Sequence, residues 1–379
     1  MRILLLGLTL IGSGLAGGCA STSAHRSFLV ERDWVHSTLS DSRKGYSATP
    51  QMTPKLVGKL IYQGNSTDGL VAYALDGRQV WRLEVPGGVN SGIEEKDGVL
   101  YFGGSDGQAY AVDALTGAVR WVFPTRAENL ATPRLSEGTL FLLSGNNVIY
   151  ALDPVSGRQK WLYDRAVSIS DLSIRGGTQP AVANGTVYVG FTDGYLVALS
   201  ARDGSVRWER LLNSNPKFRD VDSSPLIIDN QIYVASFDHA LYALGLDDGQ
   251  VLWRFEDGGA SPPTAIDDTL YSASSSGWMR ALNRKSGKVI WEKKLKKGIA
   301  SQPQLLKGIL VFAESHGNLL FWDARTGESI GQYELGWGSL ASPTVSPGTD
   351  QVFSVSNASN LHVVQARWRS GKPLSWKKE

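Results

Sequence analysis

Short apolar runs separated by turn residues recur along most of the chain. In one example, QIYVAS (231–236), LYAL (241–244) and VLWRF (251–255) are divided by Asp, Asn and Gly, and SSPLII (223–228) precedes them. Runs of this length, rich in β-branched and aromatic residues, are typical of strands joined as hairpins. No unit keeps a helical period of 3.6 residues for long enough to matter. The pattern therefore predicts units of four short antiparallel strands.

One phrase, an apolar pair with Ala followed by Asp, Gly and Trp, returns along the chain in eight copies. The steps between copies are 37, 40, 47, 45, 38, 40 and 42 residues when these positions are taken as equivalent: Ala74, Ala111, Ala151, Ala198, Ala243, Ala281, Phe321 and Val363. Four-stranded units of about 40 to 45 residues are typical of β-propellers. We therefore expect an all-β fold, an eight-bladed β-propeller of four-stranded antiparallel blades.

A tryptophan stands at the same place in most copies, and we expect it to pack as a wedge between neighbouring blades. Its positions are 81, 121, 161, 208, 253 and 291. The seventh copy lacks it, so Ile330 or Tyr333 is expected to substitute there. This regular stripe predicts core packing rather than a cofactor site.

The ring also has to close, because an open blade edge promotes aggregation. The segment Arg32 to His36 contains Trp34 but lacks the rest of a unit, so we expect it to complete the last blade beside residues 361–365. The C-terminal segment 373–376, which ends in Trp376, competes for the same place. The sequence leaves both alternatives open.

Residues 1–18 have the pattern of a secretory signal peptide, with a basic start, a short apolar core and small residues at the end. The run LAGGC (15–19) resembles the lipobox of bacterial lipoproteins, although Ala16 stands where Leu is commonest. The resemblance implies that Cys19 is acylated and anchors the chain in the outer membrane, facing the periplasm. Ordinary cleavage beside an unmodified thiol is the alternative. We expect a flexible tether over 19–31 and the propeller over 32–379.

Composition argues against several kinds of site. The net charge of +2, with 20% charged residues, does not indicate a nucleic-acid binder. Cys19 is the single cysteine, so no internal disulfide can form, and the five histidines lack the spacing of metal ligands. We predict no catalytic, cofactor-binding or metal-binding residue. The basic run EKKLKK (292–297) fits either protection of a sheet edge or a patch for lipid headgroups or nucleic acid.

The repeated phrase resembles the PQQ-type repeat of quinoprotein dehydrogenases over essentially all of residues 32–379. Those enzymes add a disulfide of adjacent cysteines, a calcium ion and a catalytic Asp. The disulfide is impossible in a chain with one cysteine, and no convincing calcium cluster is found. The repeat therefore indicates the fold and leaves the function open.

Two joints between copies are longer than the rest, since the steps of 47 and 45 residues are the largest. The first contains LSIRGG (172–177) and the second FRDVDSSP (218–225). An LSxRG stretch followed one copy later by an RxxDVDxxP-like joint resembles the BamB family, propeller lipoproteins of the outer-membrane β-barrel assembly machine. The chain departs from the family pattern at Ile174, where Leu is usual, and in a longer tail after Gln365.

The resemblance implies a non-enzymatic scaffold that docks on the periplasmic POTRA domains of a BamA-like barrel subunit. Such a scaffold aids the insertion of unfolded outer-membrane proteins, its clients. We expect the two long joints to stand together on one face and to carry the partner-binding residues, which are Leu172, Ile174, Arg175, Asp220 and Asp222.

Several alternatives remain open for these joints and for the chain. Arg175 either reaches a carboxylate of the partner or pairs with Asp220 or Asp222 as an internal clamp between blades. A partner strand added to an exposed blade edge is a second mode of contact. A quinoprotein enzyme with PQQ and calcium in the channel, and a generic periplasmic holdase, are the alternative functions.

Overall fold

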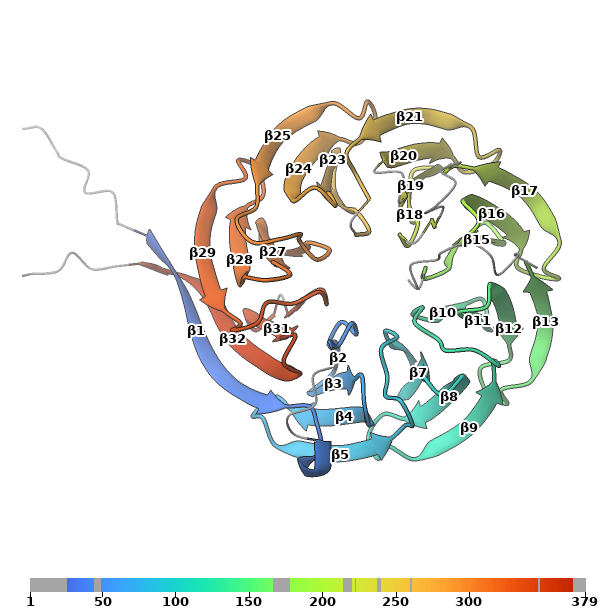
Figure 1. Ribbon diagram of the computed structural model, residues 1–379, viewed down its shortest axis with the longest axis horizontal. Helices are drawn as coiled ribbons and strands as arrows, with labels where there is room; N and C mark the ends of the chain where they lie inside the picture. Colours follow the sequence, from blue (N-terminus) through green and yellow to red (C-terminus); the bar gives the residue numbers. More distant parts are fainter. Residues whose placement is uncertain are drawn as a thin grey trace, which may run out of the picture.

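The computed structural model describes residues 26–43, 49–165, 178–213, 220–221, 223–236, 240–259, 261–346 and 348–370. Eight four-stranded antiparallel sheets are arranged as blades in a ring, with the first strand of each blade nearest the centre and the last on the outside (Figure 1). The eight-bladed propeller predicted from the repeat is confirmed. The strands predicted at 231–236, 241–244 and 251–255 lie within one residue of those observed.

The first four blades follow one another along the chain. Their strands are β2 (Lys55–Val57), β3 (Leu60–Asn65), β4 (Gly69–Ala74) and β5 (Gln79–Glu84) in blade 1; β6 (Glu94–Lys96), β7 (Val99–Gly103), β8 (Gln108–Asp113) and β9 (Val119–Pro124) in blade 2; β10 (Arg134–Ser136), β11 (Thr139–Leu143), β12 (Val148–Leu152) and β13 (Gln159–Asp164) in blade 3; β14 (Ala181–Ala183), β15 (Thr186–Gly190), β16 (Tyr195–Ser200) and β17 (Val206–Leu211) in blade 4.

The last four blades end with one that draws on both ends of the chain. Their strands are β18 (Leu226–Ile228), β19 (Gln231–Ser236), β20 (Ala240–Gly245) and β21 (Val251–Glu256) in blade 5; β22 (Thr264–Ile266), β23 (Thr269–Ala273), β24 (Trp278–Asn283) and β25 (Val289–Lys294) in blade 6; β26 (Gln304–Leu306), β27 (Ile309–Ala313), β28 (Asn318–Asp323) and β29 (Ser329–Glu334) in blade 7; β30 (Thr344–Ser346), β31 (Gln351–Val355), β32 (Asn360–Ser370) and β1 (Arg26–Ser37) in blade 8.

A short 3-10 helix, η1 (Asp41–Arg43), follows β1. Among the described residues, no helical segment is long and apolar enough to cross a membrane. The second and third strands of each blade are almost entirely buried, as in β15 and β16, whereas the outer strands alternate between exposed and half-buried side chains. The core therefore lies between the blades, where their broad faces pack together.

The tryptophan wedges form a repeated contact between blades. Each indole Nε1–H donates a hydrogen bond of 2.9–3.2 Å to a backbone carbonyl of the following blade; the pairs are Trp34–Leu75, Trp81–Ala114, Trp121–Pro154, Trp161–Ala201, Trp208–Leu246, Trp253–Arg284 and Trp291–Ala324. A glycine of the same turn lies against the ring. At Gly117 (φ 75°), an added Cβ would come within 2.8 Å of Trp81, so the position admits no side chain. The predicted wedge role is confirmed.

The contact between blades 7 and 8 is built differently. Gly331 occupies the tryptophan position, opposite Phe321, and Phe28 of β1 lies over it. The Phe28 and Phe321 rings are 5.5 Å apart between centroids. Ile330 and Tyr333 pack against the same cluster, but neither replaces the indole, so that expectation was wrong. The physical reason is that β32 runs straight on to Ser370 instead of turning back, which leaves an indole without the turn carbonyl it would bond.

The register of blade 1 also differs from the sequence alignment. Ala72, and not Ala74, pairs with Trp81 as Ala111 pairs with Trp121. The turn between β4 and β5 is shorter than its counterparts, so the structural equivalent of Ala111 is two residues before the position that the sequence alignment assigned. The equivalent position moves, and the two longest steps still fall at the same joints.

The N-terminal strand closes the ring. β1 pairs with β32 along its whole length, with Trp34 opposite Val363, so the interpretation that assigned Trp34 to the closing strand is confirmed. Residues 373–376 lie outside the described part of the chain. Because β1 begins at Arg26, residues 26–31 belong to a strand, although we expected a flexible tether there. The long β32 provides the partner that orders them.

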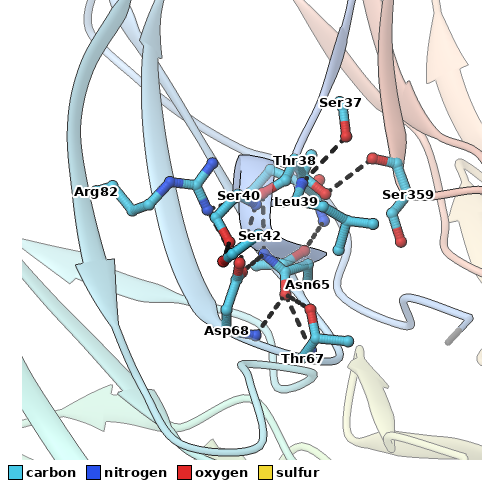
Figure 2. Close-up of polar contacts among 12 residues, drawn as sticks. Ser37, Thr38, Leu39, Ser40, Ser42, Asn65, Thr67, Asp68, Arg82 and Ser359 are labelled. Atoms are coloured by element: carbon cyan, nitrogen blue, oxygen red, sulfur yellow. Dashed lines mark hydrogen bonds and ion pairs between the residues drawn. The ribbon is translucent and has the colours of Figure 1, made fainter. Parts of the chain in front are cut away.

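Polar contacts fix the end of β1 between blades 8 and 1 (Figure 2). The Thr38 N–H and Oγ1 both donate to the Ser359 carbonyl of blade 8, at 2.8 and 2.9 Å. The Thr38 carbonyl accepts from Asn65 Nδ2 and from the Arg82 guanidinium of blade 1, each at 2.9 Å. Asp68 accepts the Ser40 N–H at 2.9 Å. One short segment therefore links the last blade to the first.

We predict that Phe28→Ala lowers the free energy of unfolding by about 2 kcal/mol, because it empties the space over Gly331 that no indole fills. Chemical denaturation of the purified chain measures this. The control is Val155→Ala, at an exposed turn on another blade, which should change stability by less than about 0.5 kcal/mol. Equal effects of the two substitutions would contradict the proposed packing.

We predict an acid-sensitive contribution of Asp68 to closure. Burial raises the pKa of Asp68, but hydrogen bonds from Ser40 and Asn65 and the charge of Arg82 outweigh it and hold the pKa below its usual value. Because the folded pKa is the lower one, the contribution is complete above the unfolded pKa of about 4 and disappears as pH falls through the folded value. Asp68→Asn should therefore lower the melting temperature at pH 7, and its difference from wild type should shrink below about pH 4. A difference that is constant with pH would contradict this role.

Candidate functional site

The structure describes only one of the five residues expected to bind a partner. Leu172, Ile174, Arg175 and Asp222 lie outside the described residues, as does Cys19. Asp220 is described, and its relative exposure is 0%. This burial disfavours direct contact with a partner, which stays a prediction for Asp220. Its burial fits the alternative in which it shapes the joint from within.

Both long joints are anchored on one turn of blade 4, the turn between β15 and β16. Before the first joint, Arg165 reaches Asp193 of this turn. Before the second joint, the N–H groups of Leu212 and Asn213 donate to the Gly194 carbonyl, at 2.9 and 3.3 Å. After the second joint, the Val221 N–H donates to the Phe191 carbonyl at 3.2 Å. The described ends of both joints therefore lie together at one face of the ring, as the step lengths predicted.

The ends that follow the two joints are also bonded to each other. Thr178 Oγ1 donates to the Val221 carbonyl at 2.9 Å, and the Gln179 N–H donates to Ser224 Oγ at 2.9 Å. Gly190 allows this close approach, because a Cβ there would lie 2.2 Å from the Val221 carbonyl oxygen. The two joints thus enter blades 4 and 5 as a connected pair.

Arg165 clamps the start of the first joint. Its guanidinium bonds Asp193 at 2.5 Å and Glu209 at 3.0 Å, and it stacks over the Tyr195 ring at 4.5 Å. Burial by itself would lower the pKa of Arg165. The hydrogen bonds to Glu209 and Asp193 outweigh this effect and raise the pKa, so the guanidinium stays protonated. Sequence reasoning missed this residue. The available signal was an arginine four positions after the blade tryptophan, where Val85, Leu212 and Leu295 stand in other blades.

A hollow of about 420 Å³ lies on the inner side of the paired joints. The first residues after each joint line it, with neighbouring inner strands and loops; among them are Gln179, Ala181, Ser224, Leu226 and Arg134. The lining mixes apolar and amide side chains with one cation. Within the described ranges there is no group of three or more His, Cys, Asp or Glu that could hold a metal ion.

The chain is similar in sequence to one family of known proteins. A family model described as "Outer membrane protein assembly factor BamB" matches residues 66–293 and 238–335. Curated proteins of that name from Salmonella typhimurium and Escherichia coli K12 are 32% and 33% identical over 192 and 193 residues, which are 46% of this chain and 48% of each relative. The chain spans about half the length of the curated relatives it matches.

Solved structures share the propeller at lower identity. BamB from Moraxella catarrhalis has a TM-score of 0.75 at 22% identity, covering 89% of this chain and 100% of that one. A europium-containing methanol dehydrogenase has a TM-score of 0.71 at 13% identity, covering 89% and 93%. At these identities the likeness concerns the fold alone. The family model spans most of the chain, from residue 66 to residue 335, and the chain therefore belongs to the BamB family of outer-membrane protein assembly factors.

Proposed function

We propose that the chain is a non-enzymatic scaffold of the outer-membrane β-barrel assembly complex. It docks on the periplasmic POTRA region of the barrel subunit and aids the insertion of outer-membrane proteins. The observation that carries this proposal is the convergence of both long joints on the turn of blade 4, in a chain whose relatives are named assembly factors. Adjacent enlarged loops on a rigid ring make a preformed surface, which lowers the entropic cost of binding.

The contact residues proposed within this surface are Leu172, Ile174, Arg175 and Asp222. Apolar side chains beside an arginine are the usual composition of a binding hot spot. Asp220 and Arg165 act from behind as positioning residues, because the first is fully buried and the second is held by two carboxylates. The positions of the described joint ends support this division of roles.

The test of docking is the affinity of the purified full chain for the purified POTRA region of the barrel subunit. We predict that Arg175→Glu weakens binding by at least about 2 kcal/mol, on the order of thirtyfold. The matched control is Arg202→Glu, an exposed arginine in the turn between β16 and β17 at the other face of blade 4, which should leave affinity unchanged. Unchanged affinity of a folded Arg175→Glu variant would overturn the site. Stoichiometric uptake of PQQ with dye-linked alcohol oxidation would overturn the non-enzymatic role.

We also propose that residues 1–18 are removed and that acylated Cys19 anchors the mature chain in the outer membrane, facing the periplasm. Since β1 begins at Arg26, few residues separate the anchor from the ring. Metabolic labelling with palmitate should mark the wild-type chain. Labelling should be lost in Cys19→Ser, and label retained by that variant would contradict the anchor.

A further inference from the structure

The turn between the second and third strands of blade 7 is flanked by two joints, as the corresponding turns of blades 2 and 4 are. It connects β27 to β28 in blade 7, and its residues are Glu314 to Gly317. The Glu314 carboxylate accepts the N–H groups of Lys296 and Lys297 at 2.9 and 3.1 Å, and the Glu314 carbonyl accepts the Ser339 N–H at 3.0 Å. The turn follows the second strand of its blade, as in blade 4, so both lie at the same face. Blades 5 and 6 separate blade 4 from blade 7 along the ring (Figure 1).

The joint after this turn exposes a large aromatic side chain. Trp337 is 75% exposed and Leu340 is 45% exposed. The positions equivalent to Trp337 in three other joints are Gly87, Ala127 and Lys297, so the blade architecture does not require a tryptophan there. An exposed indole that the fold does not need is best explained by intermolecular contact.

The loop that carries Trp337 is fixed by one asparagine. Asn357 Nδ2 donates to the Trp337 carbonyl at 2.9 Å and to the Ser315 carbonyl at 2.8 Å. Asn357 Oδ1 accepts the Leu340 N–H at 3.2 Å, and the Asn357 N–H donates to the Gly338 carbonyl at 2.8 Å. Three of these four bonds reach the loop and the fourth joins it to the turn, so the exposed side chains are held in place before a partner arrives, which reduces the ordering cost of binding.

Two lysines and a histidine border the exposed apolar pair, and the two lysines supply positive charge. Lys296, Lys297 and His316 are exposed, and the His316 N–H donates to the Lys297 carbonyl at 3.4 Å, so the three positions are contiguous. Neither ammonium group forms an ion pair with a carboxylate among the described residues. Glu314 is buried beneath the turn and its Oε1 accepts backbone N–H groups, so it is not presented outward. Both lysines lie beyond β25, so sheet-edge protection does not explain them.

We propose a second docking surface formed by Trp337, Leu340, Lys296, Lys297 and His316. It binds a partner protein that has an acidic segment for the lysines and, beside that segment, an apolar recess for the Trp337 indole. The charge of the border selects carboxylates, and the rigid tryptophan supplies the anchor. A protein is favoured over a lipid surface because β1, which follows the proposed anchor at Cys19, starts at the opposite face of blade 8, where Arg26 pairs with Ser370. This choice between the two rests on the proposed anchor. This inference does not rest on the proposed docking at blade 4.

Photocrosslinking in living cells tests the proposal directly. The photoreactive amino acid p-benzoylphenylalanine is placed at position 337 of the full chain and, as a control, at Leu115, which is 73% exposed in the turn between β8 and β9 at the other face. Irradiation should give a protein adduct from position 337 and not from position 115. The crosslinked peptide should be rich in Asp and Glu. The double variant Lys296→Glu with Lys297→Glu should reduce the adduct on the order of tenfold or more.

Two further variants keep the interpretation clear. Trp337→Ser should leave the melting temperature unchanged, because the indole is exposed, so loss of contact would not reflect unfolding. Arg175→Glu should leave the adduct from position 337 intact, which separates this surface from the joints of blade 4. The proposal is overturned by the absence of a protein adduct, by an adduct that charge reversal does not change, or by adducts with lipid alone.

Discussion

The hydrogen bond from the indole N–H of one blade to a carbonyl of the next, made by every blade except blade 7, is the interaction on which the ring depends. It needs a glycine in the receiving turn, since any Cβ there would collide with the ring system. The contact therefore specifies three things at once: which blades are neighbours, how far each is rotated, and where the turn between the third and outer strands lies. Repeated seven times among the described residues, it makes a rigid platform from units that could not bury their faces alone.

The blade that contains both ends of the chain follows a different solution. Its third strand is not followed by a turn, so blade 8 offers no turn carbonyl to an indole from blade 7. Blade 7 has Gly331 at the tryptophan position, and Phe28 fills the space over this glycine. Thr38 then ties the end of β1 to blades 8 and 1. The exposed sheet edge that an incomplete ring would leave is thereby removed, and the proposed anchor enters the fold at the seam that closes it.

The sequence was sufficient to predict the number of blades, the wedge role of the tryptophans and the two enlarged joints, because these follow from a period and a spacing. It could not predict Phe28, since that residue meets Phe321 only after the ring has closed. Nor could it predict that Asp220 is buried, because burial depends on how the chain packs against blade 4. Trp337 was overlooked because it interrupts no repeat, and its significance lies in its exposure.

In the proposed complex, the ring presents the paired joints of blade 4 to the barrel subunit. Hydrogen–deuterium exchange of the full chain, alone and with the purified POTRA region, tests it most directly. We expect new protection in peptides that cover 165–180 and 212–225 and in the turn at 190–195 between them. Protection confined to the opposite face, at the turns between third and outer strands, would contradict it.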